Sequence, residues 1–348
     1  MSFAGSSGRR SPLASGQLGL LAVALALAVT ALARPLLPLS SDVFRHLIVF
    51  DITQSMNVGD AVPSDDAPTT RLEHAKAAVL EATAALPCGS EIGLALFTGH
   101  RAFLVLAPVE VCANYADISN VVDAVDWRMA WAARSEIAKG VHSGLTIADA
   151  LGPTTSLVFV TDGHEAPPLH AELRPRFRGD PGSVRGLLAG VGGSVPLAIP
   201  KLDPQGRNLG HWKADEVIQV DELSLGRPTG VPERYAGDET GDVEARIASG
   251  TEHLSMLRES YLRSLANELR LHYRRVGDTG DLKQALQHPE LANDTEVSRD
   301  LRPLLAGMAA LFLAGSYLLS GRRRNGRPAG TFRPERGGPV PAGEPDRA

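Results

Sequence analysis

Aromatic residues are scarce in this sequence, at 5% of 348 residues, although hydrophobic residues as a whole reach 43%. The apolar content is therefore mostly aliphatic. Such a composition favours an α/β core built from Val, Ile, Leu and Ala over an aromatic-rich β-sandwich. The length is sufficient for one large domain or two ordinary ones.

The signatures of several enzyme classes are also missing. The sequence has no GxSxG nucleophile elbow, no HExxH zinc motif and no Walker A loop. The ten histidines show no metal-ligand spacing, and the glycine run at 190–195 lacks the third glycine of a dinucleotide fingerprint. We therefore expect a protein that is not an enzyme.

Charge is absent from two long runs near the chain ends, Ser11–Ala33 and Pro303–Ser320. Each run is close to the roughly 18–20 residues that a helix needs to cross hydrocarbon. Arginines precede the first run and follow the second, which by the positive-inside rule places both chain ends in the cytoplasm. Ala31-Leu32-Ala33 also resembles a cleavage site, so the first run could instead be a signal peptide.

This pattern predicts a membrane protein whose main domain is exported. The expected segments are a cytoplasmic N-terminus at 1–12, a transmembrane helix or signal peptide at 13–34, an exported domain at 35–301, a transmembrane helix at 302–320 and a disordered cytoplasmic tail at 321–348.

The expected exported domain, 35–301, is acidic. It contains 24 Lys and Arg against 37 Asp and Glu, a formal charge of −13. So acidic a surface argues against nucleic acid and anionic lipid as partners and suits a cation or a basic protein face.

Cysteine is limited to Cys88 and Cys112, which flank two expected strands at 90–97 and 101–108. If the strands pair antiparallel, Cys88 lies just before the first strand and Cys112 just after the second, so the two cysteines lie at the same end of the hairpin. An even cysteine count in an oxidising compartment predicts a disulfide, which would contribute roughly 3 kcal/mol. Two free buried thiols are the alternative.

Aliphatic strands alternate with helices along the rest of this domain. Further strands are expected at 46–50, 155–163, 184–193 and 270–276, and helices at 71–86, 115–125, 135–151 and 253–269. Ser135 is the expected N-cap of its helix. This order predicts a doubly wound, mostly parallel sheet with helices on both faces, and the acidic stretch 221–250 is expected to be an exposed insertion.

Two expected strands end on aspartate, at Asp51 and Asp162. Thr53 and Ser55 follow the first aspartate at alternate positions, and Ser135 opens the helix before the second. Ligands of doubly wound sheets bind beyond the carboxyl ends of the strands. Carboxylates and hydroxyls grouped there form a hard oxygen site, which prefers Mg²⁺, Ca²⁺ or Mn²⁺ to Zn²⁺.

The motif DITQS, a later hydroxyl residue and the motif VTDG together resemble the metal-ion-dependent adhesion site (MIDAS) of von Willebrand factor type A domains. The resemblance covers roughly 44–275. It implies a Rossmann-like sheet with one antiparallel edge strand. It also implies a divalent cation, Mg²⁺ first, whose open position accepts an acidic side chain of a partner protein.

The same match assigns ligand positions. Asp51, Thr53 and Ser55 correspond to the first metal loop, Ser135 to the second and Asp162 to the third. The family usually has serine at the position of Thr53 and threonine at that of Ser135, and both changes keep a hydroxyl. Ser143 and Thr146 are alternatives to Ser135.

A membrane-flanked domain with the stretches LPCGSEIGLALFTGHRAFLVLAPVEVC and TDGHEAPP resembles, more narrowly, the membrane-anchored MxaL-type proteins of bacterial methanol-oxidation gene clusters. This resemblance implies that the membrane is the bacterial inner membrane and that the domain 35–301 is periplasmic. It implies an assembly factor that helps metal insertion into a periplasmic dehydrogenase such as methanol dehydrogenase. A MoxR-type AAA ATPase and other membrane-anchored A-domain proteins would be partners. The alternatives are a metal-dependent hydrolase using Asp51 and Asp162, or a membrane scaffold with a vestigial metal site.

Four further side chains could form a rim around a bound partner. They are His164 and Glu165 beside Asp162, and Trp127 and Trp131 shortly before Ser135. A solvated turn and core packing are the plainer interpretations of these two pairs.

Overall fold

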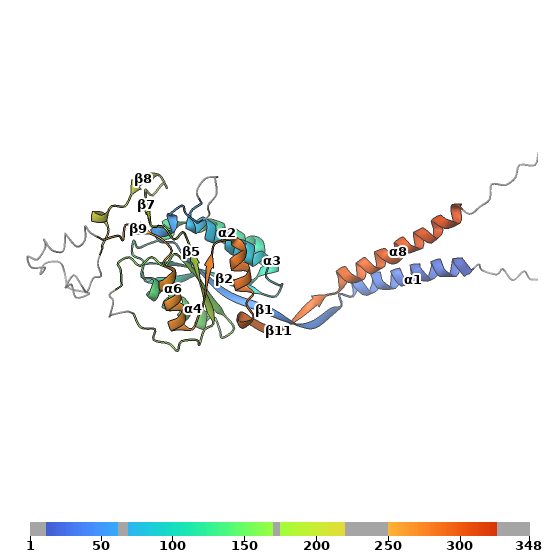
Figure 1. Ribbon diagram of the computed structural model, residues 1–348. Coiled ribbons are helices and arrows are strands. Elements are labelled where there is room, and N and C mark those ends of the chain that lie inside the picture. The colour runs from blue at the N-terminus through green and yellow to red at the C-terminus, as the bar shows by residue number, and fades with distance from the viewer. Residues whose placement is uncertain (1–11, 62–68, 170–174, 220–249, 326–348) are drawn as a thin grey trace, which may run out of the picture. The chain divides into compact units, whose positions relative to one another are not determined.

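The computed structural model of the chain describes residues 12–61, 69–169, 175–219 and 250–325 (Figure 1). It divides into residues 40–295 and a second unit made of the two chain ends. The predictions for the extreme N-terminus, for the acidic stretch 221–250 and for most of the C-terminal tail lie outside the described residues.

A mostly parallel sheet forms the centre of residues 40–295 (Figure 1). Its strand order is β10 (His272–Val276), β5 (Gly186–Val191), β4 (Ser156–Thr161), β1 (Leu36–Asp51), β2 (Glu91–Thr98) and β3 (Arg101–Glu110), with β11 (Ala292–Asp300) paired to β1. The strands from β10 to β2 are parallel, and β3 pairs antiparallel with β2. The predicted mostly parallel sheet with one antiparallel edge strand is confirmed.

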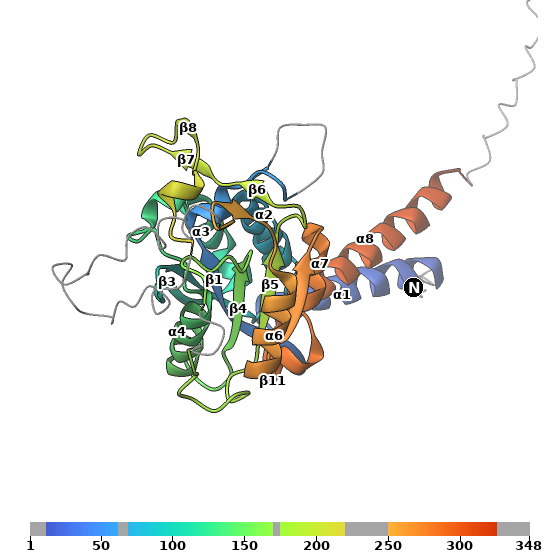
Figure 2. The same ribbon diagram turned by 60° about the vertical axis from the view of Figure 1, so that its left-hand side comes forward.

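Helices cover both faces of this sheet (Figure 2). Those packed on one face are α2 (Arg71–Ala84), α3 (Val111–Ala124) and α7 (Thr279–Leu286), and those on the other are α4 (Ile137–Ala150) and α6 (Glu259–Leu269). Successive residues of a strand point to opposite faces, so Ile48 and Phe50 join the first core whereas Leu47 and Val49 join the second. The continuous aliphatic run of β1 thus fills two cores.

The segment before α6 differs from the prediction. A helix was expected from residue 253, but Leu254–Ser255 is a short strand, β9, paired with β6 (Leu197–Ala198). The backbone amides of Leu257 and Arg258 then bond to the carbonyls of Gly193 and Asp162, so α6 begins only at Glu259. The expected helix start was wrong because tertiary pairing overrides the local apolar pattern.

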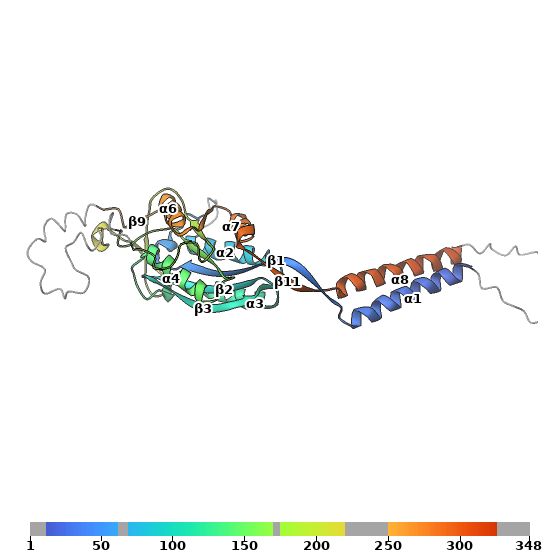
Figure 3. The same cartoon turned by 90° about the horizontal axis from the view of Figure 1, so that it is seen from below.

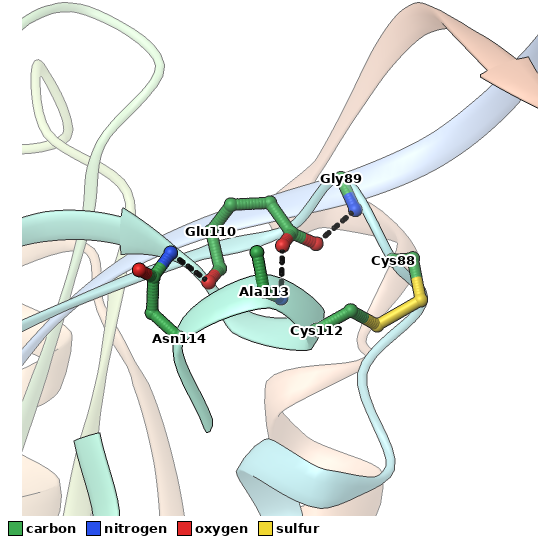
Figure 4. The surroundings of a disulfide bond; sticks show 6 residues. All are labelled: Cys88, Gly89, Glu110, Cys112, Ala113 and Asn114. Atoms are coloured by element: carbon green, nitrogen blue, oxygen red, sulfur yellow. Dashed lines mark hydrogen bonds between the residues drawn. A yellow bond between two sulfur atoms is a disulfide. The ribbon is translucent and has the colours of Figure 1, made fainter. Parts of the chain in front are cut away.

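Cys88 and Cys112 form a disulfide between the entry to β2 and the start of α3 (Figure 4). The Glu110 carboxylate caps α3 by accepting from the amides of Ala113, 2.6 Å, and Gly89, 2.8 Å. Both ends of the β2–β3 hairpin are therefore joined covalently and by hydrogen bonds at the edge of the sheet.

The chain ends form two helices, α1 (Pro12–Leu32) and α8 (Arg302–Asn325), which lie side by side (Figure 3). Among the residues that the structure describes, no helix has the length and apolarity needed to span a membrane.

Candidate functional site

The candidate site lies at the carboxyl ends of two neighbouring parallel strands. β1 and β4 pair in register up to Phe50 and Val160, so Asp51 and Asp162 follow at the same edge of the sheet. Thr53 precedes a short 3-10 helix, η1 (Gln54–Asn57), which turns the chain back over that edge. The topology brings both predicted aspartates together.

Asp51 is fully buried and accepts its hydrogen bonds only from neutral groups. Its Oδ1 accepts from the Thr53 amide, 2.9 Å, and the Thr53 hydroxyl, 2.7 Å, and its Oδ2 accepts from the Thr161 hydroxyl, 2.6 Å. The Ser55 hydroxyl lies 3.4 Å from that of Thr53. Burial, and then the negative charge of Asp162, raise the pKa of Asp51 to about 7.

Ser135 is held between two other loops. Its amide donates to the Ala166 carbonyl, 2.7 Å, its carbonyl accepts from the Ala166 amide, 2.8 Å, and it forms a parallel bridge with Gly99. The predicted N-cap role of Ser135 is wrong, because Glu136 occupies that position and α4 begins at Ile137. The Ser135 hydroxyl is buried and has no hydrogen-bond partner among the described residues.

The two alternative hydroxyls lie elsewhere on α4. Ser143 Oγ accepts from the Ala102 amide, 3.1 Å, and Thr146 Oγ1 donates to the His142 carbonyl, 3.0 Å. Of the three candidates, only Ser135 lines the pocket described next.

A pocket of about 220 Å³ opens beside Thr53, Ser55 and Ser135. Thr53, Ser55 and Ser135 line one side of it. The opposite wall comes from residues 199–218, which follow β6 and contain the hairpin β7 (Pro200–Leu202) and β8 (Asn208–His211). That wall includes Ile199, Trp212, Val217 and Ile218, and the indole N–H of Trp212 has no hydrogen-bond partner among the described residues.

The predicted rim residues separate into different places. His164 is buried and lines the pocket, and burial lowers the pKa of its imidazole. Glu165 does not line it; its carboxylate accepts from the Ala138 amide, 2.9 Å, and the Tyr261 hydroxyl, 2.5 Å. Burial raises the pKa of Glu165 to about 7.

The two tryptophans line a neighbouring pocket of about 360 Å³, which shares Gln54 and Ala133 with the first. Trp131 is 56% exposed and packs edge-on against Phe103, whereas Trp127 packs against the core. Trp131 is therefore the more accessible member of the pair.

Arg71 is the residue that the motif analysis missed. Its fully buried guanidinium bonds through Nη1 to Asp162 Oδ2, 2.5 Å, and to the Ser255 hydroxyl, 2.6 Å. Its Nε and Nη2 bond to the two carboxylate oxygens of Asp60, at 2.7 and 2.6 Å. Burial, the largest single influence, would raise the pKa of Asp162. The charges of Arg71 and His164 and the hydrogen bonds from the His164 amide and the Ser255 hydroxyl together hold that pKa below its ordinary value.

One sequence signal points to Arg71. It is the first residue of α2, where the helix dipole disfavours a cation. It also lies four residues before Ala75 on the buried stripe of that helix. An arginine at the N-terminus of a helix and on its buried face is unfavourable in both respects, so it needs a buried acidic partner.

The donor set fits a hard divalent cation. Asp51 supplies a buried carboxylate that no lysine or arginine of the described chain pairs with, and Thr53 and Ser55 add neutral oxygens. The partnerless hydroxyl of Ser135 adds a third. Asp162 differs, because it shares the single positive charge of Arg71 with Asp60.

Without divalent cations, the contribution of Asp51 to stability is expected to fall as the pH rises from 5 to 8. The native state keeps the Asp51 proton up to a pKa of about 7, whereas the unfolded chain releases it near 4, so the native state binds more protons in this window. Asp51→Asn removes this contribution. Urea unfolding in the presence of a chelator measures the free energy of unfolding at pH 5 and at pH 8. Between these pH values, the wild type should lose about 2–3 kcal/mol more than Asp51→Asn does. Equal pH dependences of the two chains would contradict this.

Comparisons with known proteins give no match to a family model and none to a curated protein. Solved structures with a similar arrangement include a von Willebrand factor type A protein from Catenulispora acidiphila, at 14% identity and a TM-score of 0.39 over 77% of this chain and 43% of that one. An uncharacterized membrane-spanning protein from Vibrio fischeri is 16% identical, with a TM-score of 0.26 over 70% of this chain and 97% of that one.

The PilB minor pilin from Streptococcus sanguinis is 12% identical, with a TM-score of 0.37 over 72% of this chain and 61% of that one. This chain thus spans less than half of the Catenulispora acidiphila protein and about three fifths of the pilin.

Proposed function

We propose that the protein is a binding module of the von Willebrand factor A type that captures partner proteins through a divalent cation. Asp51, Thr53, Ser55 and Ser135 would hold the ion, Mg²⁺ first and Ca²⁺ or Mn²⁺ as alternatives. When bound, the ion would supply positive charge to a carboxylate of the partner. The observation that carries this function is the buried Ser135 hydroxyl, which faces the same pocket as Thr53 and has no hydrogen-bond partner within the described ranges.

The far wall of the pocket supports binding rather than hydrolysis. Ile199 and Ile218 give it apolar surface, which limits water around the partner's carboxylate and strengthens its attraction to a cation. Glu216 and Glu252 also line the pocket, and Lys201 pairs with Glu216 at 2.7 Å. The Trp212 indole N–H offers a hydrogen bond to the same group. We therefore propose a module without enzymatic activity.

The finer cellular role extends this proposal. The sequence resemblance to MxaL-type proteins supports an assembly factor, anchored in the inner membrane with its acidic domain in the periplasm. It would help metal insertion into a periplasmic dehydrogenase such as methanol dehydrogenase, together with a MoxR-type AAA ATPase and other membrane-anchored A-domain proteins. The two uncharged runs support the anchoring, and carbonate extraction of membranes tests it: a chain that washes off is not anchored.

Ion binding is tested by calorimetric titration of the purified full-length chain with Mg²⁺, Ca²⁺ and Mn²⁺ after removal of metals. Saturable binding with one ion per chain is expected, together with a rise in the thermal midpoint, since the ion binds only the native state. A partner captured from the membrane fraction should be released by a chelator. Absence of saturable binding of all three ions would refute the proposed site.

A further inference from the structure

The third metal loop carries a cation of its own. The Arg71 guanidinium is completely buried and joins Asp162 on one side to Asp60 on the other. Its Nη1 also lies 3.4 Å from the Ser55 carbonyl, so the same positive group touches both the first and the third loop. A charge at this place acts directly on any ion held by those loops.

Two adjacent glycines make room for this ion pair. Gly192 has a φ of +122°, and a Cβ added there would lie 2.6 Å from Arg71 Nε. A Cβ on Gly193 would lie 3.0 Å from Asp60 Oδ2, and the Gly193 amide donates to that oxygen at 3.1 Å. The glycines that fail as a dinucleotide fingerprint thus shape a close-fitting cradle for a guanidinium and its carboxylate.

The two site aspartates consequently differ in their free charge. Asp162 Oδ2 accepts from Arg71 and from the Ser255 hydroxyl, 2.8 Å, while its Oδ1 accepts from the His164 amide, 3.0 Å. Among the described residues, Asp51 accepts only from a backbone amide and two hydroxyls. An incoming cation therefore meets one carboxylate without a cationic partner and one, Asp162, that shares the charge of Arg71 with Asp60.

We infer that Arg71 acts as a counter-cation that partly offsets the negative charge of Asp162 and thereby lowers the affinity of the site for a divalent ion. The ion is then held mainly by Asp51 and the three hydroxyls. It keeps more positive charge for the partner's carboxylate than it would beside two free aspartates, so tight capture depends on the partner. This role rests on the proposed ion-dependent binding and assigns its electrostatic control to a residue outside the metal loops.

The test measures Mn²⁺ affinity of the full-length chain by calorimetry with no partner present. Arg71→Gln keeps hydrogen-bond donors but removes the charge, and it should tighten Mn²⁺ binding about 10-fold or more. Arg71→Lys keeps the charge but loses the bidentate bonds to Asp60, and it should tighten Mn²⁺ binding less than Arg71→Gln does. Arg71→Gln with Asp162→Asn should lose the gain. Arg128→Gln, at an exposed pair with Asp126, is the matched control and should leave the affinity unchanged.

Unchanged or weaker Mn²⁺ binding in a folded Arg71→Gln chain would overturn the role of Arg71. If that variant does not fold, the single variants Asp51→Asn and Asp162→Asn, both of which keep Arg71, test the same role. Asp51→Asn should cost at least about 10-fold more Mn²⁺ affinity than Asp162→Asn, and equal losses would refute the asymmetry. A wild-type chain that binds no Mn²⁺, Mg²⁺ or Ca²⁺ would instead refute the proposed function itself.

Discussion

Asp51→Ala is expected to lower the affinity of the full-length chain for Mg²⁺ by about 100-fold or more and to abolish chelator-sensitive capture of partner proteins. Asp51 is the buried carboxylate of the site without a basic partner, whereas Asp162 is paired with Arg71. Losing the one charged ligand from a site otherwise made of hydroxyls costs about 3 kcal/mol, which corresponds to the stated factor. Calorimetric titration of both chains under identical ionic strength measures it.

The fold of the Asp51→Ala chain is expected to survive. The substitution removes a buried charge whose pKa is raised by burial, and this gain offsets part of the cost of leaving the buried donors of Thr53 and Thr161 without an acceptor, so the metal-free domain should stay folded above pH 7. Asp117→Ala, at an exposed carboxylate on α3, serves as the matched control and should keep wild-type Mg²⁺ affinity. Mg²⁺ affinity retained in a folded Asp51→Ala chain would mean that the ion binds elsewhere.

The sequence was sufficient to predict the sheet and the ends of its strands. Long aliphatic runs mark β1 and β4 as strands buried on both faces, and their terminal aspartates must then emerge at one edge. Spacing alone also predicted that Thr53 and Ser55 join Asp51, because a loop of a few residues cannot take them far away. These are local consequences of chain connectivity.

The sequence could not predict contacts that depend on distant packing. Arg71 and Asp162 are 91 positions apart, and no motif relates them. The strand at Leu254–Ser255 exists because β6 pairs with it, and that pairing also buries Ser255 against the ion pair. Burial decides which carboxylate keeps its charge, and burial is a property of the assembled fold.

The pocket wall from residues 199–218 illustrates the same limit. The segment contains the hairpin of β7 and β8. Nothing in the local pattern brings Trp212 and Ser135 to the same pocket, because that depends on where β6 and β9 attach the segment. The pocket therefore combines residues that are close in the sequence, such as Thr53 and Ser55, with a wall at 199–218 that tertiary packing brings there.

Arg71→Leu is expected to destabilise the metal-free chain by about 3–5 kcal/mol at pH 8, because it leaves Asp162 and Asp60 without their shared cation in a buried place. The loss should shrink at pH 5, since an unpaired buried Asp162 has a raised pKa and can then take up a proton. Urea unfolding at both pH values measures the difference, with Arg128→Leu as the exposed control.

A triple variant separates unpaired charge from lost packing. Adding Asp60→Asn and Asp162→Asn to Arg71→Leu removes the orphaned carboxylates while leaving the cradle of Gly192 and Gly193 as it is. If unpaired charge dominates, the triple variant should recover at least about half of the lost stability. A triple variant as unstable as Arg71→Leu alone would attribute the loss to packing around the guanidinium. Arg71 would then stabilise the loop around Asp162 by the packing of its side chain, and its effect on the charge of the site would be secondary.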